Sequence, residues 1–181
     1  MTKQNTANRG LKFEEEIQRR CDKLRQQGIA LISKVPTDWK VLRKFNPKAH
    51  RTEIFGAFPV AESKFVDFVG IINGQALGME AKETKNKTNF PFSNIKETQI
   101  DFLTEWVKLG GLGYYIIKFK EHEQVFLVPS EIMHDCIKNI GRKSAPYQWF
   151  LDNESVIELD YKKLNFDEYI RKGDVFEEIN N

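Results

Sequence analysis

Two carboxylates and one ammonium group stand close together in the sequence, around the stretch GMEAKET. Glu80 and Lys82 are two residues apart on a predicted strand, so their side chains point to the same face. Asp67 lies in the preceding apolar run FVDFVGII, where an uncompensated carboxylate is costly to desolvate. An Asn-Gly turn at 73–74 joins the two segments as a hairpin. The pattern predicts that Asp67 and Glu80 lie side by side on adjacent strands.

Two adjacent carboxylates repel each other, and a divalent cation that binds both removes the repulsion. A lysine beside them supplies positive charge where a reacting phosphate gathers negative charge. Asp67, twelve intervening residues and then Glu-x-Lys form the pattern of metal-dependent nucleases of the PD-(D/E)XK class, in which Mg²⁺ activates water and stabilises the leaving oxygen. A surface salt bridge between Glu80 and Lys82 is the alternative, because Glu-x-Lys occurs by chance in most charged proteins.

Two residues on predicted helices are further candidates for this site. Glu14 borders the apolar stripe of a helix expected from about 9 to 27, and Gln99 lies on the apolar face of a helix expected at 95–109. A buried amide needs partners, and the carbonyl oxygen of Gln99 can meet a metal-bound water or Lys82. The alternatives are a helix-start charge favoured by the macrodipole for Glu14 and a satisfied core glutamine for Gln99.

The predicted elements alternate strands with helices, which is typical of an α/β protein. The predicted strands are 29–33, 63–72, 75–83, 112–120 and 124–130, and a third helix is predicted at 130–139. Residues 152–181 are expected to add one strand and one helix, and residues 1–8 to be disordered. Residues 38–63 show no clear period and are read as a projecting hairpin, a lid or a pair of strands.

Composition bounds the class of protein. The 181 residues suit one domain or one domain with an appendage, and a net charge of +2 is no nucleic-acid signature by itself. Cys21 and Cys136 are too few for a disulfide framework or a zinc site, so they predict reduced thiols and a cytoplasmic location. The polar first ten residues hold no signal-peptide core, and no apolar run reaches the length of a transmembrane helix, so no membrane partner is expected.

Several segments together resemble a known family. They are NRGLKFEEEI (8–17), GIALISKVPT (28–37), MEAKETKNKTNFP (79–91), TQI (98–100) and GRKSAP (141–146). In this order they look like the RecU family of Holliday junction resolvases, found in Firmicutes and their phages, so a phage-encoded member is included. The resemblance spans about residues 8–150.

The resemblance implies a restriction-endonuclease-like core, with a mixed central sheet flanked by helices, in a single nuclease domain over 1–181. It also implies a homodimer with two active sites that use Mg²⁺, with Mn²⁺ as a substitute, to cut four-way DNA junctions. A stalk at about 43–62 would enter the junction centre. A recombinase or a branch-migration helicase is a further partner that it suggests.

Residue by residue, the resemblance assigns the metal-binding carboxylates to Asp67 and Glu80 and transition-state stabilisation to Lys82. Gln99 matches a glutamine of the metal site, and Glu14 matches an acidic residue that assists from the first helix. Basic loops fit phosphate contacts, which position DNA without reading its sequence, although a solvated loop is the alternative. The predicted DNA-binding residues are Arg9, Lys44, Lys48, Arg51, Lys85, Lys87, Thr88 and Arg142.

One position departs from the family pattern. The family often has a threonine near the metal, two positions before the aspartate, and here that position is Phe65, which cannot be a ligand. Phe65 keeps open a junction-binding protein whose catalysis is weak or lost, which cleavage of a four-way junction in Mg²⁺ would reject. A nuclease for another substrate, such as a flap, a duplex site or a phage recombination intermediate, also stays open. Comparing the cleavage of junctions, flaps and linear duplexes separates it.

Overall fold

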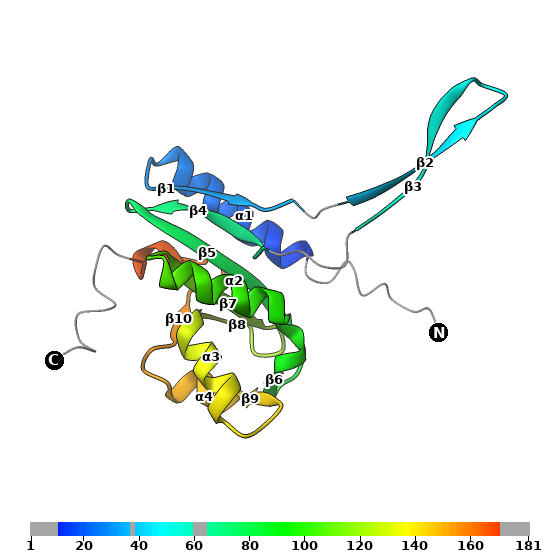
Figure 1. Cartoon of the computed structure of the whole chain (residues 1–181). Helices are drawn as coiled ribbons and strands as arrows, with labels where there is room; N and C mark the ends of the chain where they lie inside the picture. Colours follow the sequence, from blue (N-terminus) through cyan, green and yellow to red (C-terminus); the bar gives the residue numbers. More distant parts are fainter. Residues whose placement is uncertain (1–10, 37–38, 60–64, 171–181) are drawn as a thin grey trace.

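The computed structural model describes residues 11–36, 39–59 and 65–170. Its centre is a six-stranded sheet with the order β1-β4-β5-β7-β8-β10 (Figure 1). The strands are β1 (Ala30–Lys34), β4 (Phe68–Ile72), β5 (Gln75–Thr84), β7 (Leu112–Phe119), β8 (Gln124–Pro129) and β10 (Ile157–Leu159). Neighbouring strands are antiparallel, except that β5 and β7 are parallel. The predicted mixed sheet is confirmed.

The predicted hairpin between β4 and β5 is present. Asn73 and Gly74 form its two-residue turn with φ values of 51° and 82°. Positive φ at both central residues is the geometry that Asn-Gly favours, because it matches the twist of the flanking strands. The turn fixes the pairing of Phe68 with Met79, and therefore brings the start of β4 beside the second half of β5.

Helices cover both faces of the sheet. They are α1 (Leu11–Gln26) on one face, and α2 (Glu97–Lys108) and α3 (Ser130–Asn139) on the other. The buried stripe of α1 consists of Phe13, Ile17, Cys21 and Leu24. It shares one core cluster with Met79 and Ile116, whereas Leu103 of α2 and Met133 of α3 share a second cluster with Tyr115. Alternate residues of β7 thus enter opposite cores, as the two-residue period of a strand requires.

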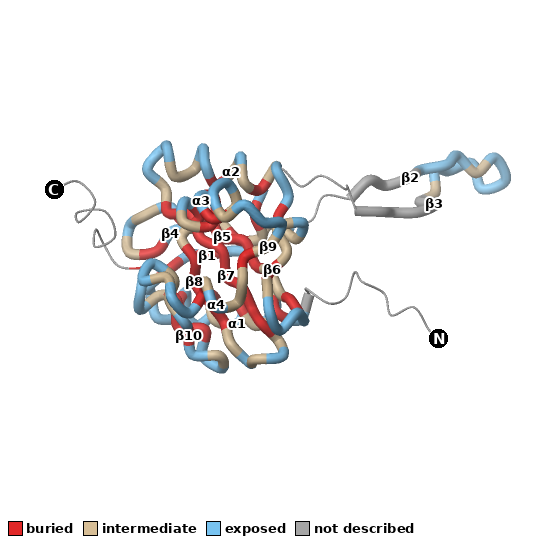
Figure 2. Tube along the Cα trace, turned by 90° about the horizontal axis from the view of Figure 1, so that it is seen from below, coloured by how far each residue is buried: buried red, intermediate tan, exposed pale blue. Residues whose placement is uncertain are grey.

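A separate hairpin projects from the body (Figure 1). It consists of β2 (Trp39–Asn46) and β3 (Arg51–Pro59), which pair with each other in a two-stranded sheet, with a register shift after Leu42. Its tip is exposed, as Figure 2 shows. Of the three structures predicted for residues 38–63, the one observed is the projecting hairpin.

Several short elements differ from the prediction. The loop expected after β5 contains β6 (Asn89–Pro91), which pairs with β9 (Ser144–Pro146), and a 3₁₀ turn at Phe92–Asn94. A short helix, α4 (Tyr147–Asp152), was also not predicted. In the tail, β10 matches the expected strand, but the expected helix is only a 3₁₀ turn, Phe166–Glu168, within the part described. The predicted disorder of residues 1–8 lies outside the described residues.

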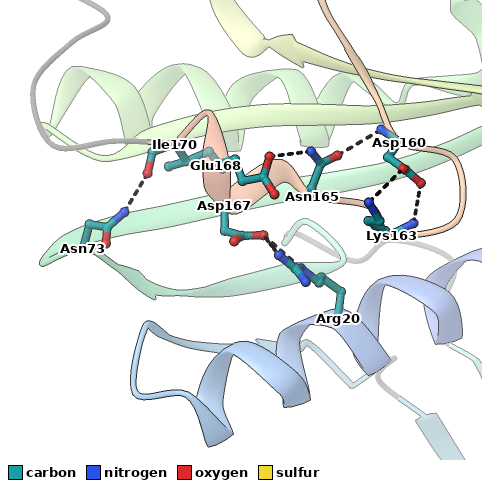
Figure 3. A network of polar contacts seen from close by, with 8 residues as sticks. All are labelled: Arg20, Asn73, Asp160, Lys163, Asn165, Asp167, Glu168 and Ile170. Atoms are coloured by element: carbon teal, nitrogen blue, oxygen red, sulfur yellow. Dashed lines mark hydrogen bonds and ion pairs between the residues drawn. The ribbon is translucent and has the colours of Figure 1, made fainter.

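A polar network ties the end of the described chain to the body (Figure 3). Arg20 of α1 donates to Asp167 from Nε at 2.9 Å and Nη2 at 2.5 Å, and Asn73 donates to the carbonyl of Ile170 at 2.8 Å. These contacts hold residues 160–170 against α1 and against the β4–β5 turn. Within the described ranges, no helix is long and apolar enough to cross a membrane.

Candidate active site at the end of strand β5

The five residues predicted to do chemistry line one cleft of about 600 Å³. They are Glu14, Asp67, Glu80, Lys82 and Gln99. They come from α1, the residue before β4, strand β5 and α2, so the cleft lies where the two helical layers meet the end of the sheet.

The two carboxylates are held together by the hairpin backbone. The amide N–H of Asp67 donates to Oε2 of Glu80 at 3.1 Å, and the amide N–H of Ala81 donates to Oδ2 of Asp67 at 3.0 Å. Each carboxylate therefore reaches across to the other strand. Asp67 lies just before β4 and not inside it, since the strand begins at Phe68 and not at Ser63 as predicted.

Two donors converge on Glu80, whose side chain is only 1% exposed. Nζ of Lys82 lies 2.5 Å from Oε1 of Glu80, and Nε2 of Gln99 donates to the same oxygen at 2.6 Å. The carbonyl oxygen of Gln99 does not face the cleft as expected. It accepts from the backbone N–H of Lys96 at 3.1 Å, because Gln99 is the third residue of α2 and forms a capping box there.

Glu14 forms one wall of the cleft and has a partner that the sequence did not suggest. Its Oε2 lies 2.6 Å from Nζ of Lys34, the last residue of β1. From the sequence, a lysine at the end of a short strand is expected to be a surface residue. The ion pair between Lys34 and Glu14 becomes visible only once α1 is packed on β1. Lys34 partly offsets the negative charge of Glu14, which lies close enough to Asp67 to act on it.

Phe65 also lines the cleft, at the position where the family often has a threonine. Its half-exposed ring packs edge-on against Phe102 of α2, with a centroid distance of 5.5 Å. The side chain is an apolar wall of the cleft and offers no ligand.

Burial governs the protonation of the acidic pair. Desolvation, followed by the nearby charge of Asp67, raises the pKa of Glu80 to about 8. Desolvation also raises the pKa of Asp67, which Lys82 partly offsets and Glu14 reinforces. A buried carboxylate and a half-buried one, Glu80 and Asp67, resist ionisation side by side. A cation bound between them stabilises both negative charges at once.

The donor set fits a hard divalent cation. Asp67 and Glu80 offer carboxylate oxygens, and Mg²⁺ is bound in proteins through one or two carboxylates together with waters and substrate phosphates. No third His, Cys, Asp or Glu joins them as a metal cluster within the part of the chain that is described. Such a site leaves coordination positions open for substrate.

Metal-free protein should lose stability as the pH rises from 5 to 8. The folded state keeps a proton on Glu80, with a pKa of about 8, that the unfolded chain releases near the ordinary value of 4.5, so the free energy of unfolding falls across this window. Saturating Mg²⁺ should raise Tm at pH 8 by roughly 5–10 °C, and less at pH 6. Thermal melts with EDTA and with Mg²⁺ measure both effects. Glu80→Gln should lose both, and an unchanged Tm of the parent protein with Mg²⁺ at pH 8 would contradict the assignment.

The predicted DNA-binding residues fall into separate groups. Lys85, Lys87 and Thr88 are exposed in the loop after β5, and Lys85 lines the cleft. Arg142 is exposed just before β9, whose pairing with β6 joins the two loops to one small sheet.

The remaining members lie elsewhere. Lys44, Lys48 and Arg51 are exposed on the projecting hairpin, and Arg51 is paired with Glu53 at 2.9 Å. Arg9 lies outside the described residues. The structure thus provides one basic group at the cleft and another on the hairpin.

The chain is similar to several known proteins. The chain is 31% identical over 169 residues to a Holliday junction resolvase RecU of Pediococcus pentosaceus, covering 92% of this chain and 83% of the relative. It is 33% identical over 145 residues to a protein of the same name from a Geobacillus species, covering 78% and 72%. A solved structure of Hjc, a Holliday junction resolvase of Archaeoglobus fulgidus, aligns with a TM-score of 0.41 and 13% identity over 87% of this chain and 93% of that one. The model of the family "RecU: Recombination protein U" matches residues 8–172, so the chain belongs to this family.

Proposed function

We propose that this protein is an endonuclease that cleaves four-way DNA junctions by metal-assisted hydrolysis of a phosphodiester. The observation that carries the proposal is the cleft in which Asp67 and Glu80 lie hydrogen-bonded across a hairpin, with Nζ of Lys82 2.5 Å from Glu80. The names of the relatives, which are Holliday junction resolvases, support the choice of substrate. A core of the restriction-endonuclease-like type fits this reaction.

We assign a role to each of the five residues that were predicted to do chemistry. Asp67 and Glu80 hold Mg²⁺, or Mn²⁺ in its place, which when bound activates water and neutralises charge on the phosphate. Lys82 holds positive charge at the cleft, where the pentacovalent phosphorane gathers negative charge. Gln99 presents its NH₂ group to Glu80, so it orients that carboxylate. Glu14 assists from the wall of the cleft as an acceptor of hydrogen bonds from water.

A homodimer is proposed because a junction is resolved by cutting two opposed strands. An uncovered apolar surface supports it: Leu31 of β1 and Ile71 of β4 pair with each other on the sheet and are 52% and 54% exposed. Contiguous apolar side chains on a surface mark an interaction site more often than scattered ones do. A second copy that covers this edge of the sheet would give two clefts in one particle.

The other partners follow from the same role. A recombinase or a branch-migration helicase would act on the same junctions and is proposed as a transient partner.

The two cysteines are free and buried, which supports a reducing compartment such as the cytoplasm.

A cleavage assay tests the proposal directly. Purified protein with Mg²⁺ should nick a synthetic four-way junction on opposed strands and cut flaps and linear duplex far less. Asp67→Ala should abolish nicking, because the remaining carboxylate binds the metal weakly, and EDTA should do the same. If flaps are nicked as fast as junctions, the four-way junction is not the specific substrate of the enzyme.

A catalytically weak junction-binding protein is the second candidate. Phe65 favours it, because an aromatic ring stands in the cleft where the family often has a threonine. The same cleavage assay distinguishes the two candidates. If the protein binds junctions but does not nick them in Mg²⁺ or Mn²⁺, the endonuclease proposal is rejected in favour of a junction-binding protein.

The hairpin should contribute to junction affinity through its charges. Lys44 and Lys48 are exposed and pair with no carboxylate among the described residues. Replacing both by Gln should lower the slope of log K against log salt by about 2, which amounts to roughly a 30-fold loss at 150 mM salt. Fluorescence anisotropy with a labelled junction in Ca²⁺ measures this. Lys108→Gln with Lys138→Gln, on α2 and α3, is the matched control, and an equal loss in the control would exclude the hairpin as a DNA contact.

A further inference from the structure

A second pocket, away from the cleft, lies between α1, the end of β7 and the segment 161–164. Its volume is about 420 Å³. Six cationic side chains of the described residues line it: Arg19, Arg20, Lys23, Lys118, Lys162 and Lys163. Glu16 is the one carboxylate in that lining. The pocket is therefore strongly basic, although the whole chain carries a net charge of only +2.

Lys118 forms the floor of this basic pocket. Its side chain is about 6% exposed, and its Nζ lies 2.6 Å from Oε2 of Glu16, whose side chain is about one-third exposed. Two rings enclose the ammonium group, with centroids 5.0 Å away for Phe13 and 4.7 Å away for Tyr161. Cation–π contacts and one carboxylate stabilise the charge, which keeps a cation at the bottom of the pocket.

The charges around the pocket do not balance. Arg20 pairs with Asp167, and Lys163 lies 3.6 Å from Asp160 (Figure 3). No described carboxylate pairs with the three other exposed cations of the lining, which are Arg19, Lys23 and Lys162. Even when Asp160 and Asp167 are counted with Glu16, six cations face three carboxylates.

Stability alone does not account for this arrangement. Like charges gathered in one recess repel each other, and a buried ammonium group costs more than an apolar side chain of similar size at the same position. An anionic ligand with several acceptor oxygens removes both costs, and a phosphate group bound by lysine and arginine is the usual case.

The position of the pocket relates it to the cleft. Glu14 of α1 lines the cleft, and Arg19 of the same helix lines the pocket, about 7.5 Å further along the helix axis. Lys118 is the register partner of Glu83 on β5, and Glu83 also lines the cleft. A duplex carries a phosphate charge for about every 1.7 Å of its axis, so an arm that reaches the cleft has phosphates within reach of the pocket.

We infer that the basic pocket binds a backbone phosphate of a DNA arm next to the cleavage site. This inference rests on the proposed function. Phosphate contacts of this kind fix the register of the DNA on the protein and carry no sequence information. The pocket would thus orient an arm, while the cleft cuts it.

Salt dependence of junction binding tests the inference. The variant Arg19→Gln with Lys162→Gln removes two exposed charges and leaves Lys118 and the cleft intact. The slope of log K against log salt should fall by about 1 for a lost phosphate contact, with about fivefold weaker binding at 150 mM salt. Anisotropy with a labelled four-way junction in Ca²⁺ measures both.

The matched control is Arg25→Gln with Lys138→Gln. Arg25 is exposed on the same helix but does not line the pocket, and Lys138 is exposed on α3. Equal slopes for the test variant, the control and the parent protein would overturn the inference. A parent protein that binds no junction at all would instead reject the proposed function, so the two failures are distinguishable.

Discussion

Replacing Lys82 by alanine is expected to lower the rate of junction nicking by about 10³-fold, with junction affinity nearly unchanged. Lys82 contributes the one ammonium group that lies directly on Glu80, at 2.5 Å, among the described residues. Its charge is needed mainly in the transition state, where the phosphorane carries more negative charge than the substrate, so the loss should fall on kcat. Single-turnover nicking of a junction measures this rate.

Two further variants control for loss of structure. Lys82→Met keeps most of the side-chain volume in this half-buried position and should be as inactive as Lys82→Ala. Lys120→Met, which removes the ammonium paired with Glu83 at 3.1 Å, should retain most of the activity. If Lys82→Met nicks at the parental rate, Lys82 has no part in the chemistry.

Replacing Gly70 by alanine is expected to have the largest effect on stability, about 3 kcal/mol or more. A Cβ atom on Gly70 would lie 2.1 Å from the carbonyl oxygen of Leu31 and 2.5 Å from Cα of Ile32. Both are backbone atoms of β1, so the clash can be relieved only by separating β1 from β4. Urea unfolding followed by circular dichroism measures the loss.

Gly78 on the neighbouring strand β5 is the matched control. A Cβ atom there meets Leu103 and Trp106 side-chain atoms at 3.4 Å, which is ordinary contact. Gly78→Ala should therefore change the free energy of unfolding by less than about 1 kcal/mol. If both variants unfold at the same urea concentration, close packing of β1 on β4 does not limit stability.

Local rules were enough to predict the centre of the site. Asp67 and Glu80 are joined by a hairpin whose Asn-Gly turn sets the register, and Lys82 follows from the two-residue period of a strand. The main features of the fold followed for the same reason, because the long strands and helices carry clear apolar periods. The roles assigned to these residues stay predictions until activity is measured.

What was missed depends on contacts between distant segments. The pairing of Glu14 with Lys34 requires α1 to pack on β1, and the pairing of Glu16 with Lys118 requires it to pack beside β7. The amide of Gln99 turned toward Glu80 because its oxygen caps α2, a competition that periodicity does not reveal. Strands of three residues, such as β6 and β9, are too short to show a period.

The hairpin was hard to read for a different reason. Its strands β2 and β3 pair only with each other within the described residues, and residues 43–53 are exposed or half-buried. With no core on either side, nothing selects an alternation of apolar and polar side chains in that stretch.

Because the hairpin is isolated, the body should not need an unbroken chain through it. The segment α1–β1 lies on one side of the hairpin in the chain and β4–β10 on the other, and they are joined by the pairing of β1 with β4 and by one core cluster. A chain opened at the hairpin tip would therefore break no contact of the body. Two polypeptides should then assemble into one complete cleft, with Glu14 supplied by the shorter piece and the acidic pair by the longer.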